Sequence, residues 1–364
     1  MLTKRKAMAL AVATTLLFSL ATMLYFVKFA SAQDFEGIII KADGSVDPPT
    51  ALIQRDGDVY TLVGDIDDYV LLERNHTIFD GAGHTIGGIC GPLPVQVDFE
   101  WQVNATTDIK IVNAVVHKEG IFFFASYNSI FANNTLNNST GLDCRGDGNV
   151  IANNTVNGGR GIAGSGNGNV ISGNHLTNCN YTFVPDNPRP YGIIVGGSNN
   201  TVFGNFIVGT NGTGISLGTS FNNTIVGNQI EDNVIGLLTR TIFSQGGAHD
   251  NLIYYNNFIN NTDNIYNEVM FGGPVAVSIW DNGVVGNYWS DYSGADADSN
   301  GIGDTPYVID ESNQDNFPLM TPVDIIPSFP SPPVPEFSSL ILLATLTTAF
   351  IGVGLFSYFK KRKR

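Results

Sequence analysis

The chain has few basic residues for its length of 364 residues. Lys and Arg together number 18 against 33 Asp and Glu, and nine of the 18 lie in residues 1–32 or 360–364. Residues 33–359 therefore carry 33 acidic and 9 basic side chains, a net charge of −24. A segment this acidic repels phosphate backbones, which argues against nucleic acid as a partner, and it favours cations as partners.

Cysteine and histidine are also scarce. Three cysteines, Cys90, Cys144 and Cys179, are too few for a disulfide scaffold, and the odd number leaves at least one unpaired within the chain. A copper site needs clustered His, Met or Cys side chains. The five histidines are instead scattered, which argues against a copper role; they are His76, His84, His117, His175 and His249.

The central region lacks strong helix formers and regularly placed leucines, but it contains a repeat. The phrase Asn-x-(Ile or Val)-x-x-Asn occurs six times, at 128–133, 149–154, 169–174, 200–205, 223–228 and 251–256. A glycine followed by an aliphatic residue precedes each copy. A period near 20 to 23 residues indicates a solenoid, whereas helical repeats need about 33 residues or more and leucine-rich repeats need Leu at several fixed positions. We therefore expect an all-β chain folded as a parallel β-helix.

The repeated asparagines are expected to have a structural role. Equivalent residues of successive rungs lie about 4.8 Å apart along such a solenoid, so identical side chains stack. A stacked asparagine can bond to the backbone of its own turn and to the asparagines above and below it. It also tolerates the left-handed backbone of a tight corner. The ladder therefore predicts fold and not chemistry.

Both ends of the chain indicate export. Lys4, Arg5 and Lys6 precede an apolar run over 7–27 and small residues at 30–32, so residues 1–32 are expected to be a signal peptide, with an uncleaved anchor as the alternative. Residues 338–359 are uncharged and 360–364 are all basic, which predicts a transmembrane helix with a cytoplasmic tail. Eleven Asn-x-Ser/Thr sequons suit an exported glycoprotein; the alternative is that an Asn- and Thr-rich repeat produces them by chance.

Four segments are expected between these ends. Residues 33–116 form an N-terminal cap and the first rungs, 117–279 the asparagine-ladder repeats, 280–322 a C-terminal cap, and 323–337 a proline-rich linker. A cap is expected because the first rung of a solenoid would otherwise expose an apolar end and an open edge. Two insertions, at 179–190 and 240–249, are candidate binding loops because loops on a rigid scaffold commonly carry function.

The ladder and the segments 42–45, 79–86 and 287–307 carry a resemblance to a known family. Over residues 36–322 the chain resembles archaeal surface proteins of the NosD-like right-handed β-helix group. The resemblance implies a right-handed, single-stranded parallel β-helix. The group takes its name from a periplasmic accessory protein for copper enzymes, and the wider superfamily contains carbohydrate-binding and sugar-cleaving members. Residues 335–337 with the following helix and tail resemble PEF-type sorting signals, which implies replacement of the helix by a lipid anchor; a plain membrane anchor is the alternative.

An aspartate-rich loop follows the repeats and resembles an EF-hand calcium loop in its spacing. It supplies oxygen ligands at loop positions 1, 3, 5, 7 and 9, from Asp296, Asp298, Asn300, the Ile302 carbonyl and Asp304. Gly301 stands at position 6, where a sharp turn is needed. Position 12 is Tyr307 in place of the usual bidentate Glu. The loop predicts a calcium site, with an Asx-rich turn that closes the last rung as the alternative.

One strand face offers weak catalytic candidates. Aligning the rungs on their glycines puts Arg145 in one column with Ser165, Gly196, Gly218 and Arg240, and Asp143 in another with Ala163, Ile194, Ser216 and Leu238. Asp143 and Arg145 share a face, because strand side chains alternate, and Asp147 is close in sequence. A polysaccharide lyase would need such a base beside acids that hold calcium against a uronate. The alternative is a solvated ion pair.

We therefore expect a cell-surface, membrane-anchored protein with a non-catalytic role, in binding carbohydrate or another surface polymer or in envelope structure. Candidate aromatic side chains for stacking on sugars are Trp101, Tyr181, Tyr191, Trp280 and Trp289. The enzyme alternative is a lyase or a glycoside hydrolase, although no pair of acids suggests a hydrolytic dyad. The second alternative is a NosD-like accessory protein for copper enzymes.

Overall fold

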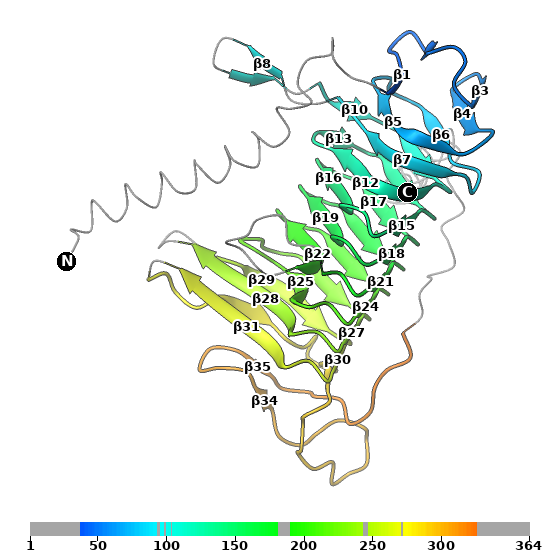
Figure 1. Cartoon of the computed structure of the whole chain (residues 1–364). Helices are drawn as coiled ribbons and strands as arrows, with labels where there is room; N and C mark the ends of the chain where they lie inside the picture. The colour runs from blue at the N-terminus through cyan, green and yellow to red at the C-terminus, as the bar shows by residue number, and fades with distance from the viewer. Residues whose placement is uncertain are drawn as a thin grey trace, which may run out of the picture. The chain divides into compact units, whose positions relative to one another are not determined.

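The computed structural model describes residues 37–92, 95–97, 100–102, 104–180, 190–242, 247–270 and 272–325. These residues form strands, turns and loops without a helix, so the described chain is all-β (Figure 1). The strands stack rung upon rung as a parallel β-helix. The predicted signal peptide, C-terminal helix and basic tail lie outside the described residues.

The largest sheet has 18 strands and two arms that share β12 (Val115–Phe123). The first arm runs in parallel through β1 (Ile38–Ile40), β5 (Ile66–Leu72), β7 (Thr85–Cys90), β12, β16 (Leu142–Arg145), β19 (Ile162–Ser165), β22 (Tyr191–Gly196), β25 (Thr213–Ser216), β28 (Ile235–Ile242) and β31 (Asp263–Met270). The second arm continues from β12 through β15 (Thr135–Asn137), β18 (Thr155–Asn157), β21 (His175–Thr177), β24 (Phe206–Val208), β27 (Gln229–Glu231), β30 (Asn257–Ile259) and β33 (Tyr288–Trp289).

An 11-stranded sheet forms the remaining side of the solenoid. Its parallel strands are β4 (Val59–Leu62), β6 (Ile78–Asp80), β11 (Lys110–Val112), β14 (Ile130–Ala132), β17 (Val150–Ala152), β20 (Val170–Ser172), β23 (Thr201–Phe203), β26 (Thr224–Val226), β29 (His249–Tyr254) and β32 (Val277–Ile279). At the N-terminal end β2 (Val46–Asp47) and β3 (Ile53–Asp56) pair antiparallel with β1 and β4. Three two-stranded sheets complete the fold: β8 (Val95–Val97) with β9 (Glu100–Gln102), β10 (Thr106–Thr107) with β13 (Ser126–Tyr127), and β34 (Tyr307–Val308) with β35 (Gln314–Asp315).

The core is built from inward columns of aliphatic and aromatic side chains, one on each side of the rung. Because side chains alternate along a strand, one central residue of each short strand points inward and its neighbours point outward. On the 11-stranded sheet the inward column is Phe131, Ile151, Ile171, Val202, Ile225 and Ile253, all fully buried. On the second arm it is Leu136, Val156, Leu176, Ile207, Ile230 and Phe258, also fully buried.

Two asparagine ladders run along corners of the solenoid. In one, Asn154 Oδ1 accepts hydrogen bonds from the backbone N–H and the side-chain amide of Asn134, at 3.0 and 3.1 Å. The Asn154 amide donates in turn to Asn174 Oδ1 and to the Phe131 carbonyl. The second ladder joins Asn149, Asn169, Asn200, Asn223 and Asn251 in the same way through backbone N–H donors. The two asparagines of each repeat therefore serve different corners.

The structure corrects the alignment of the first repeat. β14 pairs with β17 so that Phe131 lies beside Ile151. The ladder positions of that rung are therefore Ser129 and Asn134, not residues 128 and 133. Asn128 and Asn133 instead take the left-handed turn positions, with φ of 53° and 57°. The sequence pattern matched one residue too early because asparagine occupies the turn as well as the ladder.

The ladder continues past residue 279, where the predicted repeats end. β33 adds one more strand to the second arm, and Asn287 continues the ladder by accepting from the Asn256 backbone N–H at 3.2 Å. Asp315 follows as the terminal acceptor, with its Oδ2 2.6 Å from the Asn287 backbone nitrogen. The C-terminal cap therefore grows directly out of the ladder.

Candidate functional site

The outer face of the first arm presents the candidate side chains. Along β16 Leu142 and Cys144 point into the core, so Asp143 and Arg145 point outward. β16 is in register with β19, which places Asp143 beside Ala163 and Arg145 beside Ser165. The predicted Asp143 column is confirmed along its whole length, through Ala163, Ile194, Ser216 and Leu238.

Asp143 and Arg145 form a two-point ion pair. Arg145 Nε donates to Asp143 Oδ1 at 3.1 Å, and Nη2 donates to Oδ2 at 2.9 Å. The Asp143 side chain is only 9% exposed and that of Arg145 is 48% exposed. The neighbouring Asp143 carboxylate raises the pKa of Arg145, so the guanidinium keeps its proton and is a poor general base.

Asp147 does not join this pair. Its Oδ1 accepts hydrogen bonds from the backbone N–H and the side-chain amide of Asn167 in the next rung, at 2.7 and 3.2 Å. Asp147 therefore supports a turn. Of the three weak catalytic candidates, Asp143 and Arg145 contact each other, whereas Asp147 bonds to Asn167 in the turn of the next rung.

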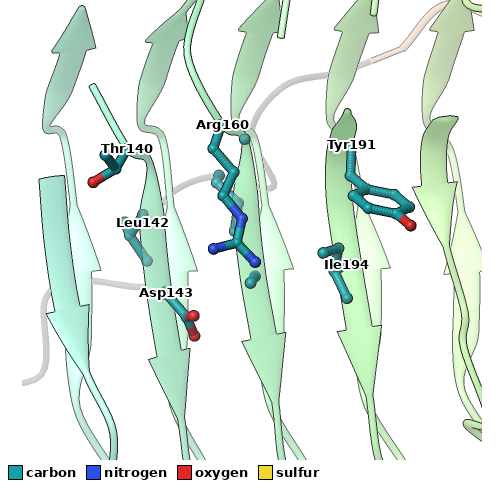
Figure 2. Close-up of a pocket in the computed structure, with 9 residues that line it drawn as sticks. Thr140, Leu142, Asp143, Arg160, Tyr191 and Ile194 are labelled. Carbon is teal, nitrogen blue, oxygen red and sulfur yellow. The ribbon is translucent and has the colours of Figure 1, made fainter. Parts of the chain in front are cut away.

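A small depression lies on this face beside Asp143. Its lining residues come from three successive rungs: Thr140, Leu142, Asp143, Arg160, Gly161, Ile162, Ala163, Tyr191 and Ile194. Figure 2 shows the Arg160 side chain between Asp143 on one side and Tyr191 and Ile194 on the other. The backbones are tightly stacked here, since a Cβ at Gly161 would meet the Gly192 carbonyl oxygen at 1.8 Å. Glycine at this corner therefore lets the rungs approach and sets the spacing of the lining side chains.

Arg160 is the residue that sequence reasoning missed. It occupies the position just before the corner glycine, which Thr140 and Tyr191 occupy in the adjacent rungs. The alignment considered only positions after the glycine. The scarcity of basic residues could have drawn attention to Arg160. Among the described residues from 119 to 325, the only Lys or Arg are Arg145, Arg160 and Arg240.

Arg240 lies farther along the same arm, in β28, and has its own carboxylate partner. β28 and β31 pair in a register that places Arg240 beside Glu268, and Arg240 Nε donates to Glu268 Oε2. Burial lowers the pKa of Arg240, but its interactions with Glu268 and Tyr191 outweigh burial, so the net pKa is raised. Both side chains are 25% exposed.

The predicted calcium loop is held by hydrogen bonds to its own carboxylates. Asp296 accepts from the backbone N–H of Asn300 at 3.0 Å and of Gly301 at 2.9 Å. Asp304 accepts from the Ala297 backbone N–H at 2.8 Å, which closes the loop. Gly301 takes a left-handed φ of 87°, as a sharp turn requires. Calcium binding by Asp296, Asp298, Asn300, Ile302 and Asp304 stays a prediction.

Four of the histidines each contact one aspartate. His76 contacts Asp108, His84 contacts Asp65, His117 contacts Asp67, and His249 contacts Asp250, at 3.2, 3.4, 3.0 and 2.9 Å. His175 instead packs edge-on against Phe206. Over the part of the chain that the structure describes, no group of three or more His, Cys, Asp or Glu is arranged to hold a metal ion.

Residues 184–294 match the family model described as periplasmic copper-binding protein (NosD). This stretch contains the rungs from β22 to β30 and the strand β33. Over this stretch the chain is a NosD-like parallel β-helix. A search of curated proteins found no match to it.

Solved structures similar to this NosD-like chain include two epimerases. One is a double mutant of the periplasmic alginate epimerase AlgG, 14% identical, with 58% of this chain and 66% of that chain covered and a TM-score of 0.29. Another is the A-module of the Azotobacter vinelandii mannuronan C-5 epimerase AlgE4, 14% identical, with 62% and 79% covered and a TM-score of 0.26. The NosD-like chain thus spans just under two thirds of AlgG.

The aromatic residues predicted to stack on sugars differ in how deeply they are buried. Trp280 and Trp289 are each 1% exposed, so the expectation that they could stack on a sugar is wrong. Trp289 instead stacks on Phe258 and Tyr307, at centroid distances of 4.5 and 4.2 Å. Tyr191 is half-buried on the candidate face. Tyr181 and the side chain of Trp101 lie outside the described residues.

The three cysteines of the NosD-like chain are free thiols. Burial raises the pKa of Cys90 and of Cys179 to about 12, and it also raises that of Cys144 well above the ordinary value. Cys144 points into the core beneath the candidate face. These thiols therefore stay protonated and pack as small apolar groups.

Within the residues that the structure describes, no helix is long and apolar enough to cross a membrane. The predicted signal peptide at 1–32, the predicted transmembrane helix at 338–359 and the PEF-like segment at 335–337 fall outside those residues.

Proposed function

We propose that this protein is an exported, membrane-anchored β-helix that binds carbohydrate on the outer face of the first arm. The observation that carries the proposal is the depression beside Asp143. It combines a carboxylate, a guanidinium, a phenol and aliphatic side chains on a backbone fixed by stacked strands. Carbohydrate sites use this combination, since sugars offer both hydroxyl groups and apolar ring faces.

The anchoring part of the proposal rests on the sequence. The basic and apolar segment at 1–32 and the uncharged run at 338–359 before five basic residues predict a body held outside the membrane. The matched family is described as periplasmic, which supports export. A body outside the cell would meet surface polysaccharides or glycans as its partners.

The geometry favours binding over catalysis at Arg145. A lyase needs a base that loses its proton near neutral pH, whereas the pairing with Asp143 stabilises the charged guanidinium. The enzyme alternative therefore depends on another base. It predicts unsaturated uronate absorbance or new reducing ends from polysaccharide substrates.

A glycan array probed with the purified full chain tests the proposal, with and without millimolar calcium. Binding to a subset of glycans that weakens when Tyr191 is replaced by Ala supports it. Lack of binding to any glycan under both conditions would overturn it. Tight copper binding by the same preparation, with no glycan binding, would instead favour the copper-binding role that the family description names.

A further inference from the structure

We infer that the depression binds the carboxylate of an acidic saccharide, with Arg160 as its anchor. The inference rests on the proposed function and names the chemical class of its ligand. Arg160 is half-buried and its guanidinium lies over the first arm (Figure 2). Among the described residues it has no side-chain hydrogen bond or ion pair, whereas Arg145 and Arg240 each hold a carboxylate.

The local charge suits an anion. Asp143 and Arg160 are the charged residues of the lining, and the Asp143 charge is already compensated by its two hydrogen bonds from Arg145. As far as the described residues show, the lining therefore keeps one uncompensated positive charge, in a segment from 33 to 359 whose net charge is −24. Most of this acidic surface repels acidic polymers. Beside the Arg160 guanidinium, the attraction on one carboxylate exceeds that repulsion.

The neighbouring groups extend the match beyond charge. A guanidinium presents parallel N–H donors that fit the two oxygens of a carboxylate. Asp143 has lone pairs left after binding Arg145, so it can accept a hydrogen bond from a sugar hydroxyl. The Tyr191 ring and Ile194 supply apolar contact for the C–H face of a pyranose ring. A ring with a carboxylate and hydroxyls satisfies all of these groups, and a neutral sugar leaves Arg160 without a partner.

The test compares acidic polymers with their neutral counterparts. The purified full chain is titrated with soluble polygalacturonate and alginate, and with the same polymers after reduction of their carboxyl groups to primary alcohols. We expect binding to the acidic forms to be about 10-fold tighter or more, since a hydrogen bond to a charged group contributes roughly 1.5 to 3 kcal/mol. Arg160→Gln should remove this preference, and Arg160→Lys should keep part of it.

Lys118→Gln is the matched control. It also removes one positive charge, but Lys118 is 44% exposed, contacts Asp67 and does not line the depression. Equal binding of acidic and reduced polymers would overturn the inference while leaving the proposed function intact, and so would equal loss in the Arg160 and Lys118 variants. Binding to sulfated polymers in preference to polyuronates would also overturn it. An absence of binding to every glycan would instead count against the proposed function itself.

Discussion

Asn174 donates its side-chain amide to Asn205 Oδ1 at 2.9 Å, although 31 residues separate them. The preceding step of the same ladder, from Asn154 to Asn174, spans 20 residues and has the same length. The insertion between β21 and β22 therefore does not change the register of the ladder. The ladder hydrogen bonds therefore keep the same geometry across rungs of different length.

Removing one ladder residue should destabilise the protein strongly. The Asn205 amide donates to the Ile171 carbonyl and to Asn228, and its oxygen accepts from Asn174. Asn205→Ala leaves several of these buried groups unpaired, at roughly 1 to 3 kcal/mol each, so we expect a loss of about 3 kcal/mol in the free energy of unfolding. Urea unfolding measures it.

The control for the ladder variant is Asn157→Ala, which removes an exposed asparagine whose amide donates to Asn137. Its effect should stay within about 0.5 kcal/mol. Similar losses in both variants would show that burial in the ladder does not matter.

The Asp143 and Arg145 pair should be replaceable only as a pair. Arg145→Ser leaves a buried carboxylate without its partner, and we expect a loss of about 2 to 3 kcal/mol. The double variant Asp143→Ala with Arg145→Ser copies the next rung, which carries Ala163 and Ser165 in register. It should unfold within about 1 kcal/mol of the parent. A double variant as unstable as Arg145→Ser alone would contradict this account.

Stability near the C-terminal cap should depend on pH through Asp315. Burial raises the pKa of Asp315 above its ordinary value, although backbone and Trp289 N–H donors oppose the shift. The native state then keeps a proton that the unfolded chain has lost, so this group's contribution falls as pH rises from the ordinary Asp pKa through the raised one. Asp315→Asn has no titrating carboxyl group at this position, so it lacks this pH-dependent contribution to the free energy of unfolding.

The matching experiment is urea unfolding of the parent and of Asp315→Asn between pH 4 and 7. The free energy of unfolding of the Asn variant, relative to the parent, should increase with pH across that range. A difference that is constant with pH, or that decreases, would refute the assignment. Asp315→Ala should lower stability at every pH, because the Trp289 indole N–H and the Asn287 backbone N–H both lose an acceptor.

Calcium should raise the melting temperature if the loop at 296–304 binds it. A ligand that binds only the native state stabilises it in proportion to the logarithm of its concentration above Kd. We expect millimolar calcium to raise the melting temperature of the parent and to leave that of the double variant Asp296→Ala with Asp298→Ala unchanged. Magnesium serves as the control ion. An unchanged melt of the parent would end the calcium hypothesis.

The thiols should be inert in the native protein. Cys144 and Cys179 are buried, and all three cysteines have raised pKa values, so little thiolate is present at pH 8. Ellman's reagent should report no fast-reacting thiol before unfolding and three in urea. Rapid native labelling of Cys144 or Cys179 would show that the core opens readily.

The sequence by itself determined the repeating architecture. A period near 20 residues, short aliphatic runs and paired asparagines leave few ways to bury one face of each strand, and stacking the rungs is the solution that satisfies them. The alternation of side chains was enough to place Asp143 and Arg145 on one face and to align their columns. These features depend on local spacing, which can be counted along the chain.

The tertiary structure decided which side chains meet across the rungs. Arg160 and Tyr191 lie 31 positions apart and are separated by an insertion, yet they line one depression with Asp143 because β19 and β22 pair. The same dependence on register explains the one-residue error in the first repeat, and the ladder that continues through Asn287 to Asp315. Contacts between rungs depend on hydrogen-bonded register, and insertions and extra turn asparagines conceal that register in the linear sequence.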